Sequence, residues 1–150
     1  MSETTAGVEA RLPIRSDLDL VWVRQHVRRA AAALGFGLVE QTKLVTAASE
    51  LARNTLVYGG GGEMAAERVA DDGRGVQGLR LTFTDRGPGI ADPERALSDG
   101  YTSGGGLGLG LGGARRLVHE FALDSTPGAG TTVTVTSWAG RPPRQREEHG

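Results

Sequence analysis

The sequence predicts an α+β fold for this chain of 150 residues, and two kinds of pattern support that prediction. Residues 16–34 and 40–57 repeat apolar side chains at helical spacing. Other segments have strand character, and the best of them alternates apolar and polar side chains. These predicted strands cover residues 11–15, 63–70, 79–85, 122–126 and 131–138. Helices and strands therefore both contribute to the expected core.

The N-terminal part of the chain is predicted to hold one short strand and one helix. Residues 1–10 lack periodicity and are expected to be a flexible end. Pro13 suits an edge position in the strand at 11–15, because proline cannot donate to a strand ladder. Ser16 and Asp19 resemble a capping box at the start of the helix. His26 lies in this helix, where a solvated or partly packed histidine is a better interpretation than a phosphoacceptor. The apolar stripe of the helix consists of Leu20, Val23, Val27, Ala30 and Leu34.

The second helix carries a polar pair beside its apolar stripe. Glu50 and Asn54 are four residues apart, so their side chains stack on one face of the helix and point at the same place. A solvated polar face is the usual explanation of such a pair. The helical pattern alone leaves that interpretation and a functional one open. The residues predicted to face the core are Leu44, Ala47, Ala48, Leu51 and Thr55.

The strand at 79–85 ends in a distinctive turn, in which Asp85 is followed by Gly87, Pro88 and Gly89. The two glycines permit a sharp turn and leave room for a flat ligand against the backbone. Pro88 fixes one φ angle and preforms the turn. Asp85 at the strand end can accept a hydrogen bond from an exocyclic amine such as adenine N6. A plain turn explains the same residues, since Asp, Gly and Pro are common in turns.

The C-terminal half is predicted to contain a glycine loop and two further helices. A short helix begins at Pro93. Eight of the 24 glycines lie between Gly100 and Gly113, which marks a loop whose backbone N–H groups can wrap phosphates. A flexible linker would leave its interleaved leucines unexplained. The following helix is expected to bury Ala114, Leu117, Val118 and Phe121. Residues 140–150 are rich in proline and charge and are expected to be disordered.

Composition excludes several classes of function. With 17 basic and 18 acidic side chains, the chain offers no electrostatic case for a nucleic-acid or membrane partner. Cysteine is absent, which excludes disulfides and thiol chemistry. No apolar run reaches membrane length, so a cytoplasmic protein is expected. The glycines at 108–113 match a dinucleotide fingerprint, but no strand precedes them.

Three blocks in order, residues 49–54, 84–90 and 103–110, resemble the N, G1 and G2 boxes of the GHKL ATP-binding superfamily. Residues 128–131 resemble its G3 element, so the resemblance extends from about Leu12 to Trp138. It implies a two-layer sandwich of the Bergerat type, with a mixed, mainly antiparallel sheet and helices on one face. It also implies one ATP-binding domain over residues 11–139, flanked by flexible termini at 1–10 and 140–150.

The resemblance assigns expected roles to individual residues. Glu50 would be catalytic and would accept or orient the proton of an incoming hydroxyl. Asn54 would supply an oxygen ligand to Mg²⁺ beside the phosphates of ATP. Asp85 and Thr131 would contact the adenine. The complete set expected to bind the nucleotide is Asn54, Asp85, Gly87, Gly89, Ser103, Gly104, Gly105, Gly106, Leu107, Gly108 and Thr131.

Within the superfamily, the chain resembles the stand-alone serine/threonine kinases of the anti-sigma-factor group, especially the switch kinases of bacterial stressosomes. This implies STAS-domain proteins as substrates and, for the released kinase, a PP2C-type phosphatase as partner. Thr102 stands where sigma-binding relatives often carry an arginine, which argues against direct binding of a sigma factor. An ATP-binding anti-sigma factor that sequesters its partner and a pseudokinase are the alternatives. The presence of both Glu50 and Asn54 weighs against the pseudokinase.

Overall fold

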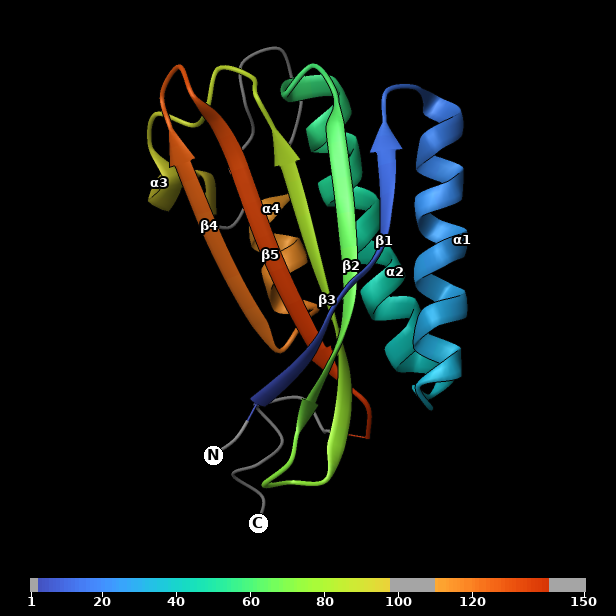
Figure 1. The fold of residues 1–150 in the computed structure, drawn as a ribbon. Helices are drawn as coiled ribbons and strands as arrows, with labels where there is room; N and C mark the ends of the chain where they lie inside the picture. Colours follow the sequence, from blue (N-terminus) through green and yellow to red (C-terminus); the bar gives the residue numbers. More distant parts are fainter. Residues whose placement is uncertain (1–2, 98–109, 141–150) are drawn as a thin grey trace.

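One antiparallel sheet with helices on one of its faces makes up the fold (Figure 1). The computed structural model describes residues 3–97 and 110–140. Its strands are β1 (Glu3–Ile14), β2 (Gly62–Asp71), β3 (Val76–Asp85), β4 (Glu120–Thr126) and β5 (Gly130–Trp138), in the order β1-β2-β3-β5-β4. The helices are α1 (Asp17–Ala33), α2 (Leu38–Arg53), α3 (Pro93–Leu97) and α4 (Leu111–Arg116). The predicted α+β sandwich is confirmed, and every described strand pair is antiparallel.

The core fills the space between the sheet and the helices. Along β3, Leu79, Leu81 and Phe83 are buried, and the residues between them face the opposite side of the sheet. The predicted stripe of α2 is confirmed, because all of its members, from Leu44 to Thr55, are buried. Burying one such leucine or phenylalanine stabilises a fold by about 1.5–3 kcal/mol. The two layers are therefore held together chiefly by these facing apolar stripes.

The first strand is longer than predicted. Residues 3–10 are not a flexible end, because they pair with β2 from Glu3 opposite Asp71 onward. The register shifts twice near Val8, and the neighbouring Gly7 has a φ of 85°. These irregularities are β-bulges, in which an extra residue interrupts the alternation of side chains. The pairing was missed because a bulged strand lacks the period of two on which strand prediction depends.

The helix after the glycine loop is shorter than predicted. α4 ends at Arg116, and Phe121 belongs to β4, where it lies opposite Val135 of β5. Leu117, Val118 and Phe121 do pack against the core, as expected, but only Leu117 directly follows the helix. The spacing of these residues fits a helix, yet the hydrogen-bond partners offered by β5 draw the chain into the sheet. Tertiary pairing overrides the local pattern here.

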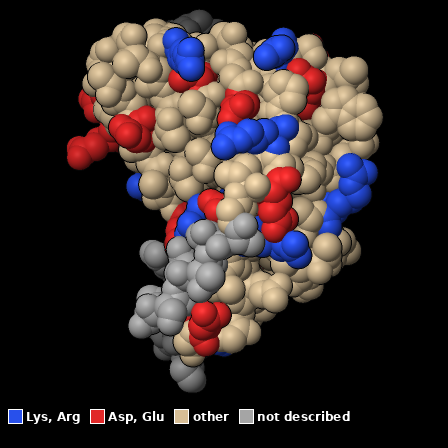
Figure 2. Space-filling model, in the orientation of Figure 1, with Lys and Arg blue, Asp and Glu red and all other residues tan. Residues whose placement is uncertain are grey.

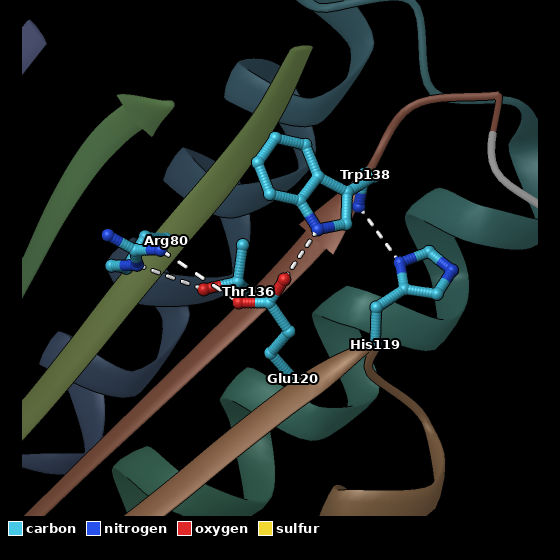
Figure 3. Close-up of polar contacts among 5 residues, drawn as sticks. All are labelled: Arg80, His119, Glu120, Thr136 and Trp138. Carbon is cyan, nitrogen blue, oxygen red and sulfur yellow. Dashed lines mark hydrogen bonds and ion pairs between the residues drawn. The ribbon is translucent and has the colours of Figure 1, made fainter. Parts of the chain in front are cut away.

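The face of the sheet away from the helices carries a cluster of hydrogen-bonded side chains at the end of β5, separate from the apolar core (Figure 3). Trp138 is 1% exposed, and its indole Nε1 donates to Glu120 Oε2 at 2.9 Å. Its backbone N–H donates to His119 Nδ1, also at 2.9 Å. Arg80 joins the cluster through a 3.0 Å hydrogen bond to Thr136 Oγ1. Buried indoles need such a partner, so Glu120 makes the burial of Trp138 possible.

His26 lies in a groove between α1 and β1, beside Leu12, Pro13 and Trp22. Burial lowers the pKa of His26, and the nearby Arg29 lowers it further, while Glu9 acts in the opposite direction. A partly packed histidine agrees with the prediction for this position.

Charges of both signs are intermixed on the face of the molecule shown in Figure 2, which has the orientation of Figure 1. Nucleic acids and anionic membranes attract patches of positive charge. The described residues form no such patch on this face. No helix within residues 3–97 and 110–140 has both the length and the apolar character that crossing a bilayer requires.

Candidate functional site

A row of polar side chains crosses one end of the sheet on the side of the helices. Asp85 at the end of β3 lies opposite Thr131 of β5, and Thr131 lies opposite Ser125 of β4. Directly paired residues project from the same face of a sheet. Two residues earlier on β3, Phe83 is buried in the core. Asp85, Thr131 and Ser125, called the polar row below, therefore line the helix side where the apolar core ends.

The turn after Asp85 is fixed by the backbone around it. Asp85 Oδ1 accepts a hydrogen bond from Gly87 N–H at 2.9 Å. A Cβ atom on Gly87 would lie 2.7 Å from Gly59 Cα, too close for any side chain. Gly89 has a φ of 76°, and a Cβ there would overlap the carbonyl oxygen of Thr126. Both glycines are thus required by close backbone packing, whether or not they also leave room for a ligand.

The same turn is attached to the hairpin between β4 and β5. Ile90 N–H donates to Ser125 Oγ at 2.7 Å, and Gly128 N–H donates to Pro88 O at 2.7 Å. Two hydrogen bonds and the contact of Gly89 with Thr126 hold the two turns as one unit. Ser125 was missed by the sequence analysis, because a single serine in a strand belongs to no recognisable motif.

The turn that follows the C-terminal end of α2 packs against Asp85 of the polar row. After Arg53 the chain continues as a π-turn (Asn54–Tyr58), in which Gly59 N–H donates to Asn54 O at 3.0 Å. A Cβ on Gly59 would overlap the carboxylate of Asp85. The predicted helix over 40–57 thus ends in a wider turn, which carries the chain directly against the end of β3. Single π-turns of this kind are frequent at functional sites.

Glu50 lies one helical turn before Asn54 and reaches the start of α4. Its side chain is exposed, and its Oε1 lies 2.5 Å from the place that a Cβ on Gly110 would occupy. Gly110 has a φ of 66°, a left-handed conformation that suits glycine. The predicted phosphate-binding residues Ser103, Gly104, Gly105, Gly106, Leu107 and Gly108 lie outside the described residues. The chain is described again from Gly110, immediately beside Glu50.

The structure thus brings six sequence-predicted residues to one end of the molecule, where α2, β3 and the turn between β4 and β5 meet (Figure 1). Asn54 begins the π-turn that packs on Asp85, and Asp85 faces the same side as Thr131. Gly87 and Gly89 form the turn between them and the β4–β5 hairpin. Two chemically different halves result, one with Glu50 and Asn54 and one with the polar row.

The residues of this site suit ATP and Mg²⁺. The polar row offers a carboxylate and hydroxyls, which match the donors and acceptors on the edge of a purine. Within the described ranges, no three His, Asp or Glu side chains converge to hold a metal by themselves. A single carboxamide oxygen from Asn54 fits Mg²⁺, which keeps several waters and takes phosphate oxygens as ligands. A metal held jointly by protein and nucleotide requires no larger cluster.

Comparison with known proteins identifies the family. Residues 39–140 match the family described as "Histidine kinase-, DNA gyrase B-, and HSP90-like ATPase". The chain belongs to this ATPase family. This is the superfamily that the ordered N, G1, G2 and G3 blocks predicted. The predicted GHKL membership is therefore confirmed.

Three individual proteins show which kinds of ATPase-family member this chain resembles. The chain is 46% identical over 125 residues to the serine/threonine-protein kinase RsbT of Bacillus subtilis, covering 83% of this chain and 92% of that protein. It is 33% identical over 117 residues to an anti-sigma F factor of Pasteuria penetrans, covering 75% of this chain and 77% of that protein. An anti-sigma F factor of Thermoanaerobacter is 27% identical over 124 residues, covering 79% of this chain and 85% of that protein. The predicted likeness to the kinases of the anti-sigma-factor group is confirmed.

Proposed function

We propose that this protein is an ATP-dependent serine/threonine protein kinase of a bacterial partner-switching pathway that controls a stress or alternative sigma factor. One observation carries the proposal: the turn that begins at Asn54 ends at Gly59 against the Asp85 carboxylate, and Asp85 lies opposite Thr131. The strong similarity to a protein named as a serine/threonine kinase supports the same conclusion. Phosphoryl transfer to a hydroxyl uses a carboxylate that positions the hydroxyl and a metal ligand beside the phosphates, and a base-reading pair would hold the ATP in place.

Each half of the site has its own task in the proposed mechanism. Asp85 accepts a hydrogen bond from the exocyclic amine of adenine, and Thr131 contacts the same region of the base. Asn54 contributes an oxygen ligand at the phosphate end. Glu50 accepts or orients the proton of the incoming serine or threonine hydroxyl, which makes that oxygen a better nucleophile. ATP supplies the phosphoryl group, and Mg²⁺ offsets the charge of its phosphates.

The proposed substrates are STAS-domain proteins, and a PP2C-type phosphatase is the proposed second partner of the released kinase. The resemblance to partner-switching kinases is the basis for both. Sequestration of a sigma factor is the second candidate function, because two of the relatives are named anti-sigma F factors. Glu50 favours the kinase, since sequestration alone requires no proton acceptor at the phosphate end.

Incubation with candidate STAS proteins tests the proposed activity directly. With ATP and Mg²⁺ present, the intact mass of the true substrate should rise by the mass of one phosphoryl group, about 80 Da. The control reaction contains a chelator that removes Mg²⁺, and the mass should then stay unchanged. Stable complex formation with a sigma factor, without any mass increase in any STAS protein, would instead favour sequestration.

A further inference from the structure

The groove between α1 and β1 lies at one edge of the fold and shares no residue with the candidate site (Figure 1). Its volume of about 310 Å³ is at the small end of the range for ligand pockets and leaves room for a few side chains. On its α1 wall, Trp22 is 50% exposed, and Leu18, one helical turn earlier, is 62% exposed. Large apolar side chains gathered beside a hollow are typical of a surface that binds a partner. The residues that line the groove are Leu12, Pro13, Asp19, Trp22, His26 and Arg29.

The charges around the groove leave one cation uncompensated. Asp19 Oδ2 accepts from a backbone N–H at the start of α1 at 2.8 Å. Glu9, whose charge acts on His26, is engaged in an ion pair with Arg68 at 2.7 Å. Arg29 is exposed and forms no ion pair with any residue in the ranges 3–97 and 110–140. A carboxylate on a partner would complement this guanidinium.

The edge of β1 favours a helix over an added strand as the occupant. β1 is the outermost strand of the sheet, so among the described residues no strand pairs with its outer edge. Pro13, at the groove, has no N–H to donate to an added strand. Two bulges near Val8 distort the same edge further along. The side chains of a helix can fill the groove without using the backbone of β1.

We propose that this groove docks an amphipathic, acidic helix of a protein partner. Apolar side chains of that helix contact Trp22 and Leu18, and one of its carboxylates pairs with Arg29. A second copy of this chain fits less well, because its own groove would bring another Arg29 together with carboxylates that are already engaged. The proposal is independent of the proposed kinase activity, since the groove and the candidate site have no residue in common.

The test uses two synthetic helical peptides with the same stripe of leucines, flanked by glutamates in one peptide and by lysines in the other. The chain has two tryptophans, and Trp138 is buried, so quenching of fluorescence by acrylamide reports chiefly on Trp22. The acidic peptide should shield Trp22 from acrylamide. It should also bind roughly tenfold more tightly than the basic peptide, because it gains an attraction to Arg29 and avoids a repulsion. The anisotropy of a dye on each peptide supplies the dissociation constants.

Variants of α1 locate the binding surface. Arg29→Glu should lower the ratio of the basic to the acidic dissociation constant by at least roughly tenfold, because it reverses the charge at the groove. Arg28→Glu makes the same charge change at a neighbouring exposed residue that does not line the groove, and it should keep the wild-type ratio. Trp22→Ala should weaken binding of the acidic peptide by at least about tenfold, as expected for a tryptophan at the centre of a contact. The emission of Trp138 shows whether that variant is folded.

Equal binding of the two peptides by the wild-type protein would overturn the proposal. An Arg28→Glu variant that behaves like Arg29→Glu would overturn it as well, because the preference would then come from the charge of the whole helix. Binding of the acidic peptide that leaves Trp22 open to acrylamide would place the peptide elsewhere on the molecule. A dimeric wild-type protein in which Trp22 is already shielded would assign the groove to a second copy of the chain.

Discussion

Replacing Glu50 by glutamine should lower phosphoryl transfer by roughly 10²–10⁴, the usual contribution of a positioned general base. Glu50→Gln keeps the size and polarity of the side chain and removes only its ability to take a proton. Nucleotide affinity should change little, because the carboxylate serves the incoming hydroxyl and is not a ligand of the phosphates. The measurement is the initial rate of substrate phosphorylation, with ATP affinity determined separately.

The position of Glu50 makes this variant informative. Its side chain is exposed and contacts the protein at Gly110, so the amide should not disturb the fold. Glu67→Gln is the matched control, because Glu67 of β2 lies opposite Arg80 of β3, on the face of the sheet away from the helices. Transfer by Glu50→Gln at the wild-type rate would remove Glu50 from the catalytic role and leave the nucleotide site standing.

Asn54→Ala should instead weaken the binding of ATP in the presence of Mg²⁺, by roughly 10- to 100-fold. The change removes one oxygen ligand from the phosphate end of the site, where interactions with charged groups are worth more than neutral hydrogen bonds. Transfer should fall with it, because a poorly held metal no longer offsets the phosphate charge. ATP is titrated once in the presence of Mg²⁺ and once in the presence of a chelator. The difference between the two affinities is the part that depends on the metal.

Thr46→Ala provides the comparison for Asn54→Ala, since Thr46 is an exposed residue of the same helix. Loss of a side chain from the surface of α2 should leave ATP affinity as it is. An Asn54→Ala variant with equal loss of affinity in Mg²⁺ and in chelator would show that Asn54 binds no metal. Undiminished phosphorylation by both Glu50→Gln and Asn54→Ala would refute the kinase role of this helix face.

The parts of the fold that could be predicted are those with strong local signals. β3 and the turn after Asp85 were predicted because regular alternation ends there in an aspartate, two glycines and a proline. The core face of α2 was predicted because its stripe keeps a strict helical period. Positions governed by distant partners were harder to predict. β1 stays paired with β2 through two bulges. Phe121 belongs to β4 because its backbone pairs with β5 opposite Val135.

The candidate site shows the same division. Asp85 and Thr131 could be named in advance because each stands beside glycines in a recognisable block. Ser125 and Gly59 could not, because their roles depend on contacts that cross the fold. Gly59 has an ordinary φ of −84°, so its backbone does not require glycine, and only the carboxylate of Asp85 excludes a side chain there. A spatial requirement of this kind leaves no trace in a single sequence.

The relative affinity for ATP and GTP tests the central claim most directly, namely that Asp85 and its neighbours form a site for adenine. The Asp85 carboxylate would face the O6 carbonyl of guanine, and an unmet buried acceptor costs about 1–3 kcal/mol, more when it is charged. ATP should therefore bind at least roughly tenfold more tightly than GTP, and Asp85→Asn, whose amide can also donate, should lose most of that preference. Equal affinity of the wild-type protein for the two nucleotides, or binding of neither, would contradict the assignment.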